Sequence, residues 1–466
     1  MKRALNIGID ADGVIFDLFR FQIEKGKKHF KKTDEEINID KYDIADIFNC
    51  SRTKRQLFWI KHIYEYCMYS PLMDAAVESM KKWRDEGHKL YNITSRVYVD
   101  NRTPLGAFFR YMIEKRYKKE GIVFDGIDYC SEKNSARDKT LACSKRQIDV
   151  MLEDKEDNIE AISKISKVLC FDAGYNQNCD VENMIRVSGF KESDEIIQQI
   201  AMSQEKELGD TQYVVDGKFK RVRAKDEAKL TRQQLIDYYK QRKQYYADQV
   251  NREQMEKHQR NFKMAYRVII PAFKGYYNPQ IINKELIPYQ NGMIFVANHL
   301  DYKDQFVLLP ALGNRPVHFL AASELLEMKR GLLYKNVGCV FVDRHSMRSK
   351  AESLETLTSI VANNGNIFIF PEGTRNRDPE KYMLDLLPGP VMIAQLTGAP
   401  IVPIAINNNY RFRSNDLLAR IGEPFIVRPE DNLEEVNDKL KEILSTMIWE
   451  NMEKEAEINK TLTLKR

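Results

Sequence analysis

The strand-like stretch ALNIGIDADGVIFD (residues 4–17) contains two aspartates, Asp10 and Asp12, just before Gly13. A strand of a parallel sheet is buried on both faces, and its carboxyl end is where ligands of open α/β sheets bind. Two carboxylates at that place suit a divalent cation, and they can divide the roles of nucleophile and proton donor. Aspartates of an ordinary turn are the alternative interpretation of this pattern.

Three later stretches supply further polar groups beside apolar runs. They are Thr94 in KLYNITSR (89–96), Lys139 in DKTLACSKRQ (138–147), and Glu153 and Asp154, with Asp157 close behind, in IDVMLEDKEDN (148–158). These three features favour a functional site over turn aspartates.

In this order, the four pieces resemble the four motifs of the haloacid dehalogenase-like phosphatases, and the resemblance covers about residues 1–200. It implies Asp10 as the phosphoryl-accepting nucleophile and Asp12 as the general acid/base. It also implies that Thr94 and Lys139 bind the transferring phosphoryl group, and that Asp10, Asp12 and Asp154 hold a Mg²⁺ ion. The implied fold is a Rossmann-like parallel sheet with a helical cap.

The lysine of this set has two competitors, Lys133 and Lys145. Lys139 is preferred because it precedes the helix that leads into the strand ending at Glu153 and Asp154. That order is the one found in the family pattern.

Residues 18–70 form a charged, aromatic-rich insert whose pattern indicates helices. In the family that the chain resembles, an insert at this position is a cap whose closure excludes water and reads the leaving group. The sequences ITSR and FDAGYN (171–176) lean toward the nucleotidase-like branch of that family. Trp59 and Tyr64 are able to stack on a base, but aromatics at helical spacing more often form cap core. The phosphatase substrate therefore stays open.

A second candidate site begins at VANHLDYKDQF (296–306), where an apolar run ends near His299 and Asp304 follows five residues later. An imidazole paired with a carboxylate is a general base whose tautomer the carboxylate fixes. This spacing also occurs by chance in many proteins, so the downstream stretches carry the argument. They are NVGCVFVDRH (336–345), GNIFIFPEGTRNRD (365–378) and TGAPIVPIAI (397–406).

Together these stretches resemble the glycerolipid acyltransferases of the 1-acylglycerol-3-phosphate acyltransferase type, over about residues 262–455. The resemblance implies that His299 takes the proton of the acceptor hydroxyl, with Asp304 orienting the imidazole and without an acyl-enzyme. It also implies a set of residues that bind the glycerol-phosphate part of the acceptor, in which a guanidinium matches a phosphate bidentately. The implied set is Arg344, Glu372, Gly373, Thr374 and Arg375.

The region between the two sites, residues 201–262, has a different character. TQYVVDGKFKRVR (211–223) places Asp216 and Gly217 between alternating runs, which predicts a hairpin. Residues 230–262 lack Pro and Gly and carry a sparse apolar stripe, which predicts one long, solvated helix linking two domains. Residues 263–278 are apolar and aromatic with flanking Lys and Arg, which suits either an interfacial element on a membrane or a helix packed on the next domain.

Composition limits the remaining classes. A chain of 466 residues is too long for one ordinary core, and a net charge of only +5 argues against a dedicated nucleic-acid binder. Seven cysteines without a CxxC pair favour a reducing compartment over disulfides or a zinc site. The N-terminus meets Asp10 too early for a signal peptide, and the uncharged run 386–410 contains prolines and asparagines that argue against a spanning helix.

The expected protein is α/β throughout, with a phosphatase domain at 1–200 (cap about 18–70), a hairpin and helical linker at 201–262, and an acyltransferase domain at 263–466. The expected function is transfer of a fatty acyl group from acyl-CoA or acyl-carrier protein to 1-acylglycerol-3-phosphate, fused to a Mg²⁺-dependent phosphatase. The acyltransferase is expected to need no cofactor beyond its acyl donor. The expected location is cytoplasmic, peripheral at the inner face of the cell membrane, with no nucleic-acid partner.

The alternative is an acyltransferase acting on another lysophospholipid, joined to a non-catalytic, ligand-sensing N-terminal domain. One departure from the family pattern keeps the acceptor open. Family members often carry a lysine shortly before the glycine of the fourth block, whereas LLPGP (386–390) has none. A serine is also common where this chain has Asn376, which matters less.

Overall fold

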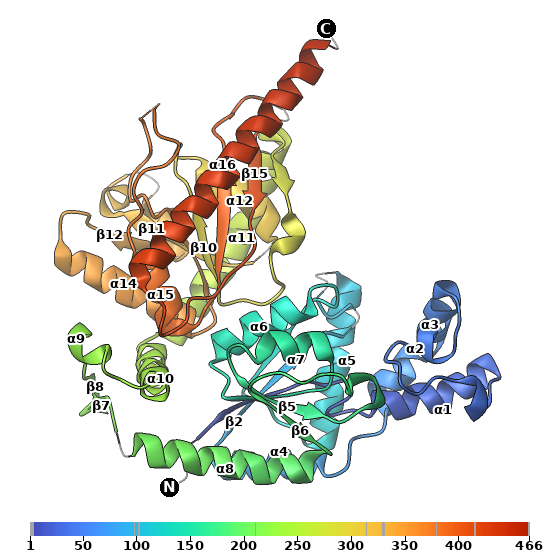
Figure 1. Cartoon of the computed structure of the whole chain (residues 1–466). Coiled ribbons are helices and arrows are strands. Elements are labelled where there is room, and N and C mark those ends of the chain that lie inside the picture. Colours follow the sequence, from blue (N-terminus) through green and yellow to red (C-terminus); the bar gives the residue numbers. More distant parts are fainter. Residues whose placement is uncertain are drawn as a thin grey trace. The chain divides into compact units, whose positions relative to one another are not determined.

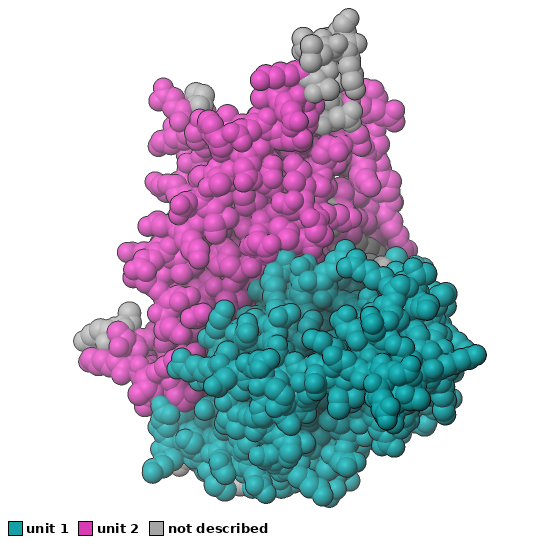
Figure 2. Space-filling view, turned by 45° about the vertical axis from the view of Figure 1, so that its right-hand side comes forward, with its two compact units in different colours: residues 1–210, 288–290 teal, residues 211–287, 291–466 magenta. Residues whose placement is uncertain are grey.

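The computed structural model describes residues 4–96, 98–100, 103–209, 211–313, 315–328, 331–378, 380–413 and 416–464. The chain divides into two compact units, which Figure 2 colours separately: residues 1–210 with 288–290, and residues 211–287 with 291–466. The middle region expected at 201–262 is therefore shared, because residues up to 210 belong to the first unit and the rest belong to the second.

The first unit is built on a six-stranded parallel sheet in the order β3-β2-β1-β4-β5-β6. Figure 1 labels β2, β5 and β6 of this sheet. Its strands are β1 Asn6–Ile9, β2 Lys89–Thr94, β3 Gly126–Tyr129, β4 Val150–Glu153, β5 Lys167–Phe171 and β6 Met184–Val187. In β1, Ile9 lies level with Asn92 of β2 and with Leu152 of β4. The carboxyl ends of these three strands are thus neighbours, and the predicted Rossmann-like sheet is confirmed.

Helices cover both faces of this sheet. One face carries α4 Ala76–Asp85, α5 Pro104–Glu120 and α8 Phe190–Leu208, and the other carries α6 Ser135–Arg146 and α7 Glu156–Ile162. Local sequence sets the ends of α5: the Thr103 hydroxyl accepts from the Gly106 N–H, and Gly121 ends the helix in the left-handed conformation. The apolar helix faces bury Trp83 and Phe190, whose rings stack at 5.8 Å.

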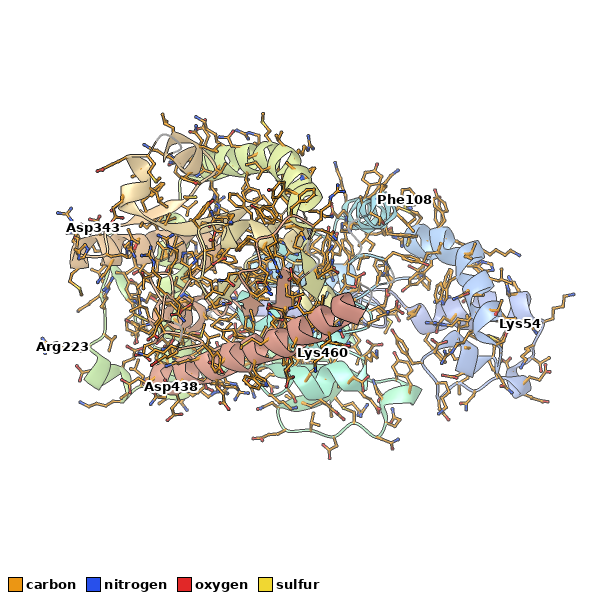
Figure 3. All side chains as sticks on the ribbon, turned by 90° about the horizontal axis from the view of Figure 1, so that it is seen from above. Lys54, Phe108, Arg223, Asp343, Asp438 and Lys460 are labelled. Atoms are coloured by element: carbon orange, nitrogen blue, oxygen red, sulfur yellow. The ribbon has the colours of Figure 1, made fainter. Side chains whose placement is uncertain are left out.

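The cap consists of α1 Leu18–Phe30, a 3₁₀ turn η1 Asp34–Glu36, α2 Ile44–Ile47 and α3 Arg52–Tyr69. It has a small core of its own, in which Phe48, Phe58 and Tyr66 are buried. In Figure 3, Lys54 marks the first turn of α3, and Phe108 marks α5 of the sheet domain. The cap is joined to the sheet core by the end of α3, because Cys67 and Met68 are buried in that core.

The second unit is built on a seven-stranded sheet in the order β12-β11-β13-β10-β14-β15-β9. The strands are β9 Gln280–Ile282, β10 Ile294–Ala297, β11 Val317–Ala322, β12 Val340–Val342, β13 Asn366–Ile369, β14 Ile401–Ile406 and β15 Leu418–Ile421. The pair β14–β15 is antiparallel, and every other pair is parallel. β10 lies at the centre, between β13 and β14.

Helices also cover both faces of the second sheet. One face carries α11 Arg252–Tyr277 and α12 Asp304–Leu312. The other face carries α14 Met347–Ala362, α15 Gly389–Thr397 and α16 Leu433–Leu464. The short α13 Gly331–Asn336 lies between β11 and β12 in the chain. Figure 3 labels Asp438 and Lys460 toward opposite ends of α16. Residues 386–410 form a turn, helix α15 and strand β14, as predicted.

The hairpin predicted at Asp216 and Gly217 is present as β7 Val214–Val215 and β8 Lys218–Phe219, and both turn residues have positive φ. The single helix expected over 230–262 is wrong. After the short α9 Ala224–Glu227, the chain forms α10 Arg232–Asp248 and then α11. The break has a local cause, because the Asn251 side chain accepts from the Gln254 N–H and begins a new helix.

Helix α10 is also less solvated than expected. Its tyrosines Tyr238, Tyr239 and Tyr246 are buried in a small cluster that includes Leu396 of α15. The Tyr239 hydroxyl donates to Gln395 of α15 at 3.1 Å. The stripe of tyrosines is therefore a packing face within the second unit.

Candidate active sites

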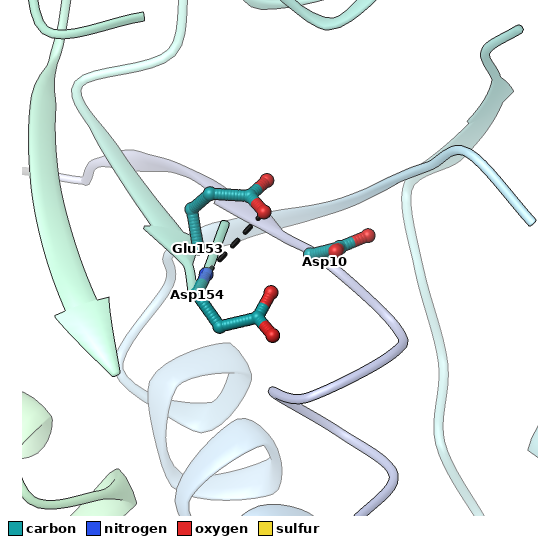
Figure 4. A group of neighbouring side chains, drawn as sticks. All are labelled: Asp10, Glu153 and Asp154. Atoms are coloured by element: carbon teal, nitrogen blue, oxygen red, sulfur yellow. Dashed lines mark hydrogen bonds between the residues drawn. The ribbon is translucent and has the colours of Figure 1, made fainter. Parts of the chain in front are cut away.

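The carboxyl ends of β1 and β4 bring three acidic side chains of the first unit together. Asp10 follows β1, Glu153 ends β4, and Asp154 follows it (Figure 4). One carboxylate oxygen from each lies within 4.8 Å of the others, and all three residues are buried. Asp10 is also anchored by its backbone, since its N–H donates to the Leu152 carbonyl at 3.0 Å. The parallel pairing of β1 with β4 thus builds the predicted acidic cluster.

Lys139 of α6 is the lysine that reaches this cluster. Its ammonium lies 2.9 Å from Asp10 Oδ2 and 2.7 Å from Glu153 Oε2, and the residue is fully buried. The competing Lys145 instead pairs with Asp128 at 2.5 Å, and Lys133 is exposed. Lys139 lies one turn into α6, whereas Lys145 lies in its last turn.

Glu153 has a different role from the other two acids. Its Oε2 accepts from Lys139, and its Oε1 accepts from the Asp154 and Lys155 N–H groups and from the Asn158 amide. Its carboxylate is therefore committed to holding Lys139 and the turn after β4. No feature of the sequence separated this role from that of Asp154.

The other two acids have free ligand atoms. Within the described residues, Asp10 Oδ1 and Asp154 Oδ1 are buried without a hydrogen-bond partner, and so is the Thr94 hydroxyl at the end of β2. Asp154 Oδ2 accepts from the Tyr175 hydroxyl. Carboxylate oxygens are the ligands that Mg²⁺ prefers, so the two unpartnered oxygens fit a divalent cation.

The electrostatics of the cluster also fit a cation. Burial raises the pKa of Asp10, with Glu153 adding to the rise and Lys139 opposing it. Burial, then Glu153 and Asp10, raise the pKa of Asp154 well above its ordinary value. Burial alone would lower the pKa of Lys139, but Asp10 and Glu153 raise it overall. A divalent cation would favour the ionised form of both aspartates, because it supplies the missing positive charge.

Gly13 is required beside this cluster. Its φ is +81°, and a Cβ atom there would lie 2.0 Å from Asp154 Oδ2. Only a residue without a side chain lets the turn after β1 approach the acids so closely.

Asp12, which was expected among the metal-holding residues, lies outside the acidic cluster found in the described part of the chain. Its Oδ1 accepts from the Tyr66 hydroxyl of α3 and from Arg96 Nε, each at 2.5 Å. Oδ1 of Asp12 is thus engaged by a guanidinium and a hydroxyl. Its place in the metal set stays a prediction. Burial raises the pKa of Tyr66 well above the usual tyrosine value, so its hydroxyl remains a donor.

Arg96 and Tyr66 were missed as site residues by the sequence analysis. Arg96 belongs to the ITSR sequence and could have been found there, whereas no pattern marked Tyr66 among the many aromatics of the cap. Trp59 packs in the cap core against Phe58 and Tyr66, and Tyr64 is exposed. The cap-core interpretation of Trp59 is therefore the one that its contacts support.

The second site lies at the carboxyl end of β10 in the second unit. His299 Nδ1 is 3.0 Å from Asp304 Oδ2, and Asp304, the first residue of α12, is fully buried. The same oxygen accepts from the Leu300 and Asp301 N–H groups, so the turn between the two residues is closed by the carboxylate itself. None of the described residues bonds to His299 Nε2, which leaves this nitrogen available. The imidazole stacks on Phe370 with ring centroids 4.0 Å apart.

Asn298 fixes the place where the chain turns out of the sheet. Its amide donates to the Ile406 carbonyl and its oxygen accepts from the Ile406 N–H, both at 2.8 Å. The side chain therefore continues the pairing of β10 with β14 beyond the last strand residue, and His299 follows at a fixed point.

A tyrosine completes the environment of Asp304. The Tyr410 hydroxyl donates to Asp304 Oδ1 at 2.5 Å, on the oxygen that the histidine does not use. Burial and Asp304 raise the pKa of Tyr410, so the hydroxyl stays protonated. The sequence analysis missed Tyr410, because it lies 106 residues from Asp304 and outside the recognised motifs.

Glu372 does not face outward as a binding residue would. Its Oε1 accepts from the His299 N–H at 2.7 Å, and its Oε2 accepts from the Leu384 N–H at 2.9 Å. Each oxygen accepts from a backbone N–H inside the protein, so Glu372 holds the backbone at the histidine. Its expected role in binding the acceptor stays a prediction. Burial raises its pKa, and the two N–H donors oppose this rise.

The remaining members of the expected binding set lie at the surface. Thr374, Arg375 and Arg344 are exposed. Arg344 donates to the Gly373 carbonyl at 2.9 Å, which places its guanidinium beside the turn after β13. Gly373 has φ +66°, a conformation that favours glycine. These two arginines thus leave guanidinium groups open to solvent near the histidine-bearing edge of the sheet.

Residues 278–407 match the protein family described as Acyltransferase. The chain is 32% identical over 151 residues to a probable 1-acyl-sn-glycerol-3-phosphate acyltransferase of Mycoplasma pneumoniae, a match that covers 31% of this chain and 55% of that relative. It is 22% identical over 195 residues to a putative nucleotidase of Halalkalibacterium halodurans, covering 41% of this chain and 92% of that relative. The chain thus spans only about half the length of the first relative.

Among solved structures, the 1-acyl-sn-glycerophosphate (LPA) acyltransferase of Thermotoga maritima matches at 23% identity with a TM-score of 0.32, covering 46% of this chain and 88% of that chain. The family match and the first relative confirm the resemblance of the C-terminal part to 1-acylglycerol-3-phosphate acyltransferases. The N-terminal part is similar to a putative nucleotidase, in line with the nucleotidase-like branch expected for it. Among the described residues, no helix is both long and apolar enough to cross a bilayer.

Proposed function

We propose that the second unit transfers a fatty acyl group from acyl-CoA or acyl-carrier protein to the free hydroxyl of 1-acylglycerol-3-phosphate. The observation that carries this proposal is the His299–Asp304 pair, with Nδ1 held at 3.0 Å and Nε2 free of partners among the described residues. A carboxylate on Nδ1 keeps the proton there, so the lone pair of Nε2 is available as a base.

The proposed reaction needs no covalent enzyme intermediate. His299 Nε2 accepts the proton of the acceptor hydroxyl while the oxygen of that hydroxyl attacks the thioester carbonyl carbon. The carbon–sulfur bond then breaks, and the imidazolium returns the proton to the departing thiolate. Asp304 stabilises the imidazolium, and Tyr410 with the two backbone N–H groups holds Asp304 in place. Arg344 and Arg375 are proposed to bind the acceptor phosphate, with Gly373 and Thr374 shaping the turn between them.

The test is acyl transfer by the purified protein from a long-chain acyl-CoA to lysophosphatidic acid, with the product identified by mass spectrometry. Phosphatidic acid is expected. If none forms, other lysophospholipids and an acyl-carrier donor are the next substrates, because LLPGP lacks the lysine that family members often carry.

Replacing Tyr410 by Phe is expected to lower kcat of acyl transfer about tenfold, because Asp304 loses one donor to its charged carboxylate. KM for the acceptor should change little, since Tyr410 acts through Asp304. Steady-state kinetics measure both values. Tyr382→Phe, at an exposed tyrosine of the same unit, is the matched control. Equal kcat in the wild type and Tyr410→Phe would contradict the role given to this residue.

We further propose that the first unit is a Mg²⁺-dependent phosphomonoester hydrolase. Asp10 Oδ2 lies beside Lys139, and its Oδ1 has no partner, which suits a nucleophile that also binds a cation. Asp10 and Asp154 would hold Mg²⁺, which supplies positive charge for the phosphoryl oxygens when bound. Lys139 and Thr94 bind the phosphoryl group, and Asp12 moves the proton of the leaving oxygen.

The phosphatase proposal is tested by phosphate release from nucleotides and sugar phosphates with and without Mg²⁺. Release that depends on Mg²⁺ is the expected result. Binding of a phosphorylated compound without any release would instead favour a ligand-sensing domain.

The proposed location of the whole protein is the cytoplasm, at the inner face of the cell membrane.

Helix α11 supports peripheral membrane contact. One of its faces packs inward through Phe262, Ile270 and Phe273, while Met264 and Val268 are 67% and 74% exposed. Lys263, Arg267 and Lys274 are exposed on the same helix. An exposed apolar stripe with flanking cations suits the surface of an anionic bilayer. The inward face of α11 therefore packs on the second unit, and the exposed face is the one proposed to contact a membrane.

Replacing Met264 and Val268 together by Glu is expected to weaken binding to phosphatidylglycerol vesicles by about tenfold or more, because two apolar side chains can no longer enter the bilayer. Vesicle co-sedimentation measures the change. Met202→Glu, at a 51% exposed methionine of α8, is the control. Unchanged sedimentation of the double variant would exclude α11 as the contact.

A further inference from the structure

Asp12 is held by one oxygen only. Its Oδ1 accepts from the Tyr66 hydroxyl and from Arg96 Nε, and Arg96 Nη2 pairs with the same atom. All contacts that Asp12 makes with the described residues use Oδ1, and its side chain is 17% exposed. An oxygen that accepts from several donors has no room for a proton of its own, so a proton carried by this carboxyl must sit on Oδ2.

The two donors come from different parts of the first unit. Arg96 follows β2 in the sheet domain, and Tyr66 lies near the end of α3 in the cap. Arg96 is buried, with its guanidinium 4.6 Å from the centre of the Phe16 ring and 4.8 Å from that of Tyr66. Arg96 therefore belongs to the sheet domain, and the Tyr66 ring covers its guanidinium.

Tyr66 is fastened to the cap. Its ring lies 5.0 Å from that of Phe21 and 5.6 Å from that of Trp59, both in the cap. Its hydroxyl reaches Asp12 at 2.5 Å and accepts from Arg96 Nη2 at 3.2 Å, and its ring lies over the Arg96 guanidinium. The next two residues of α3, Cys67 and Met68, are buried in the core of the sheet domain, so the end of the helix that bears Tyr66 is anchored there.

We propose that Tyr66 is a positioning residue that aligns the Asp12 carboxyl for proton transfer. The inference rests on the proposed phosphatase function. Tyr66 and Arg96 together fix Oδ1, which leaves Oδ2 to give its proton to the leaving oxygen. Without the Tyr66 hydroxyl, Arg96 alone would hold the carboxyl, and the rotation of the carboxyl would be less restricted.

The test uses the dependence of rate on the leaving group. A well-aligned proton donor matters most when the departing oxygen is strongly basic and least when it leaves unaided. The full-length protein with Mg²⁺ is assayed on p-nitrophenyl, phenyl and benzyl phosphates, three substrates of similar size and increasing leaving-group basicity. kcat/KM is the readout, because it reports the steps up to departure of the alcohol.

Tyr66→Phe is expected to lower kcat/KM only about threefold for p-nitrophenyl phosphate and about 100-fold for benzyl phosphate. Tyr64→Phe is the matched control: the same change on the same helix, at a tyrosine that is 57% exposed. It should leave all three values unchanged. Arg96→Lys, which keeps the charge but loses the fork, should give the same graded loss as Tyr66→Phe.

Each other outcome has a definite meaning. An equal loss on all three substrates would mean that Tyr66 only supports the cap, and it would overturn the inference while leaving the phosphatase function intact. No loss on benzyl phosphate would also overturn it. If the wild type releases no phosphate from any of the three, or if Asp10→Asn releases it as fast as the wild type, the proposed function itself fails.

Discussion

Replacing His299 by Ala is expected to lower kcat/KM for acyl transfer about 10³-fold, which corresponds to roughly 4 kcal/mol of transition-state stabilisation. The acceptor hydroxyl then has no base at the point where its oxygen attacks the thioester. Asp304 cannot substitute, because it is fully buried and four donors already surround its carboxylate. Product formation from acyl-CoA and lysophosphatidic acid, measured by mass spectrometry, gives the rate.

The control for this variant is His345→Ala, at an exposed histidine of the same unit. It should transfer acyl groups like the wild type. Circular dichroism of His299→Ala should match the wild type as well, since the buried Asn298 and Glu372 continue to hold the backbone at this position. Product formed by His299→Ala at the wild-type rate would remove His299 from the mechanism.

Replacing Asp10 by Asn is expected to lower phosphate release by about 10⁴-fold or more, because the amide neither attacks phosphorus nor carries the charge that binds Mg²⁺. The second readout is thermal. Mg²⁺ should raise the unfolding temperature of the wild type, since a ligand that binds only the folded state stabilises it, and this shift should shrink in the variant. Phosphate release and differential scanning fluorimetry measure the two effects.

Asp85→Asn, at an exposed aspartate of α4, is the matched control and should keep both the activity and the Mg²⁺ shift. Asp10→Asn should also keep acyl transfer, which would show that the second unit of the variant is folded. A variant that still responds to Mg²⁺ like the wild type would show that the cation binds elsewhere.

The parts of both sites that a sequence can specify are the ends of strands. An apolar run ends at or just before each of four site residues, Asp10, Thr94, Asp154 and His299. Parallel pairing brings the carboxyl ends of neighbouring strands together, and this does not depend on the conformation of the loops. The α/β class and the parallel sheet of the first unit followed from the same runs. The hairpin at Asp216 and Gly217 was also predictable, because both residues tolerate the positive φ that its turn requires.

What could not be predicted depends on contacts between distant segments. Tyr66 reaches Asp12 over 54 positions, and Tyr410 reaches Asp304 over 106. Each is one aromatic among many, and only the packing of the surrounding helices selects it. The contacts of Glu372 were unpredictable for a related reason: a motif acid indicates a ligand group, and only the folded chain shows that its two oxygens accept from the His299 and Leu384 N–H groups.

The break between α10 and α11 illustrates a different limit. Residues 249–251 contain no Pro or Gly, so the sequence gave no clear signal of a break, and α11 begins at the Asn251 cap while Tyr246 near the end of α10 is buried. A cap of this kind is worth about 1 kcal/mol, which is small beside the free energy gained by packing. The helix predicted from the local sequence pattern therefore differs from the observed helices mainly at residues 249–251.

The carboxamide of Asn298 has a consequence for what this position can tolerate. Its amide donates to Ile406 and its oxygen accepts from Ile406, as a peptide group of a paired strand would. The side chain therefore makes the two hydrogen bonds that the backbone cannot make where the chain turns out of the sheet. Aspartate has the shape but no donor, leucine has neither donor nor acceptor, serine is too short, and glutamine is longer by one methylene. The identity of this residue is thus dictated by the geometry of its neighbour, although it takes no part in the chemistry beside it.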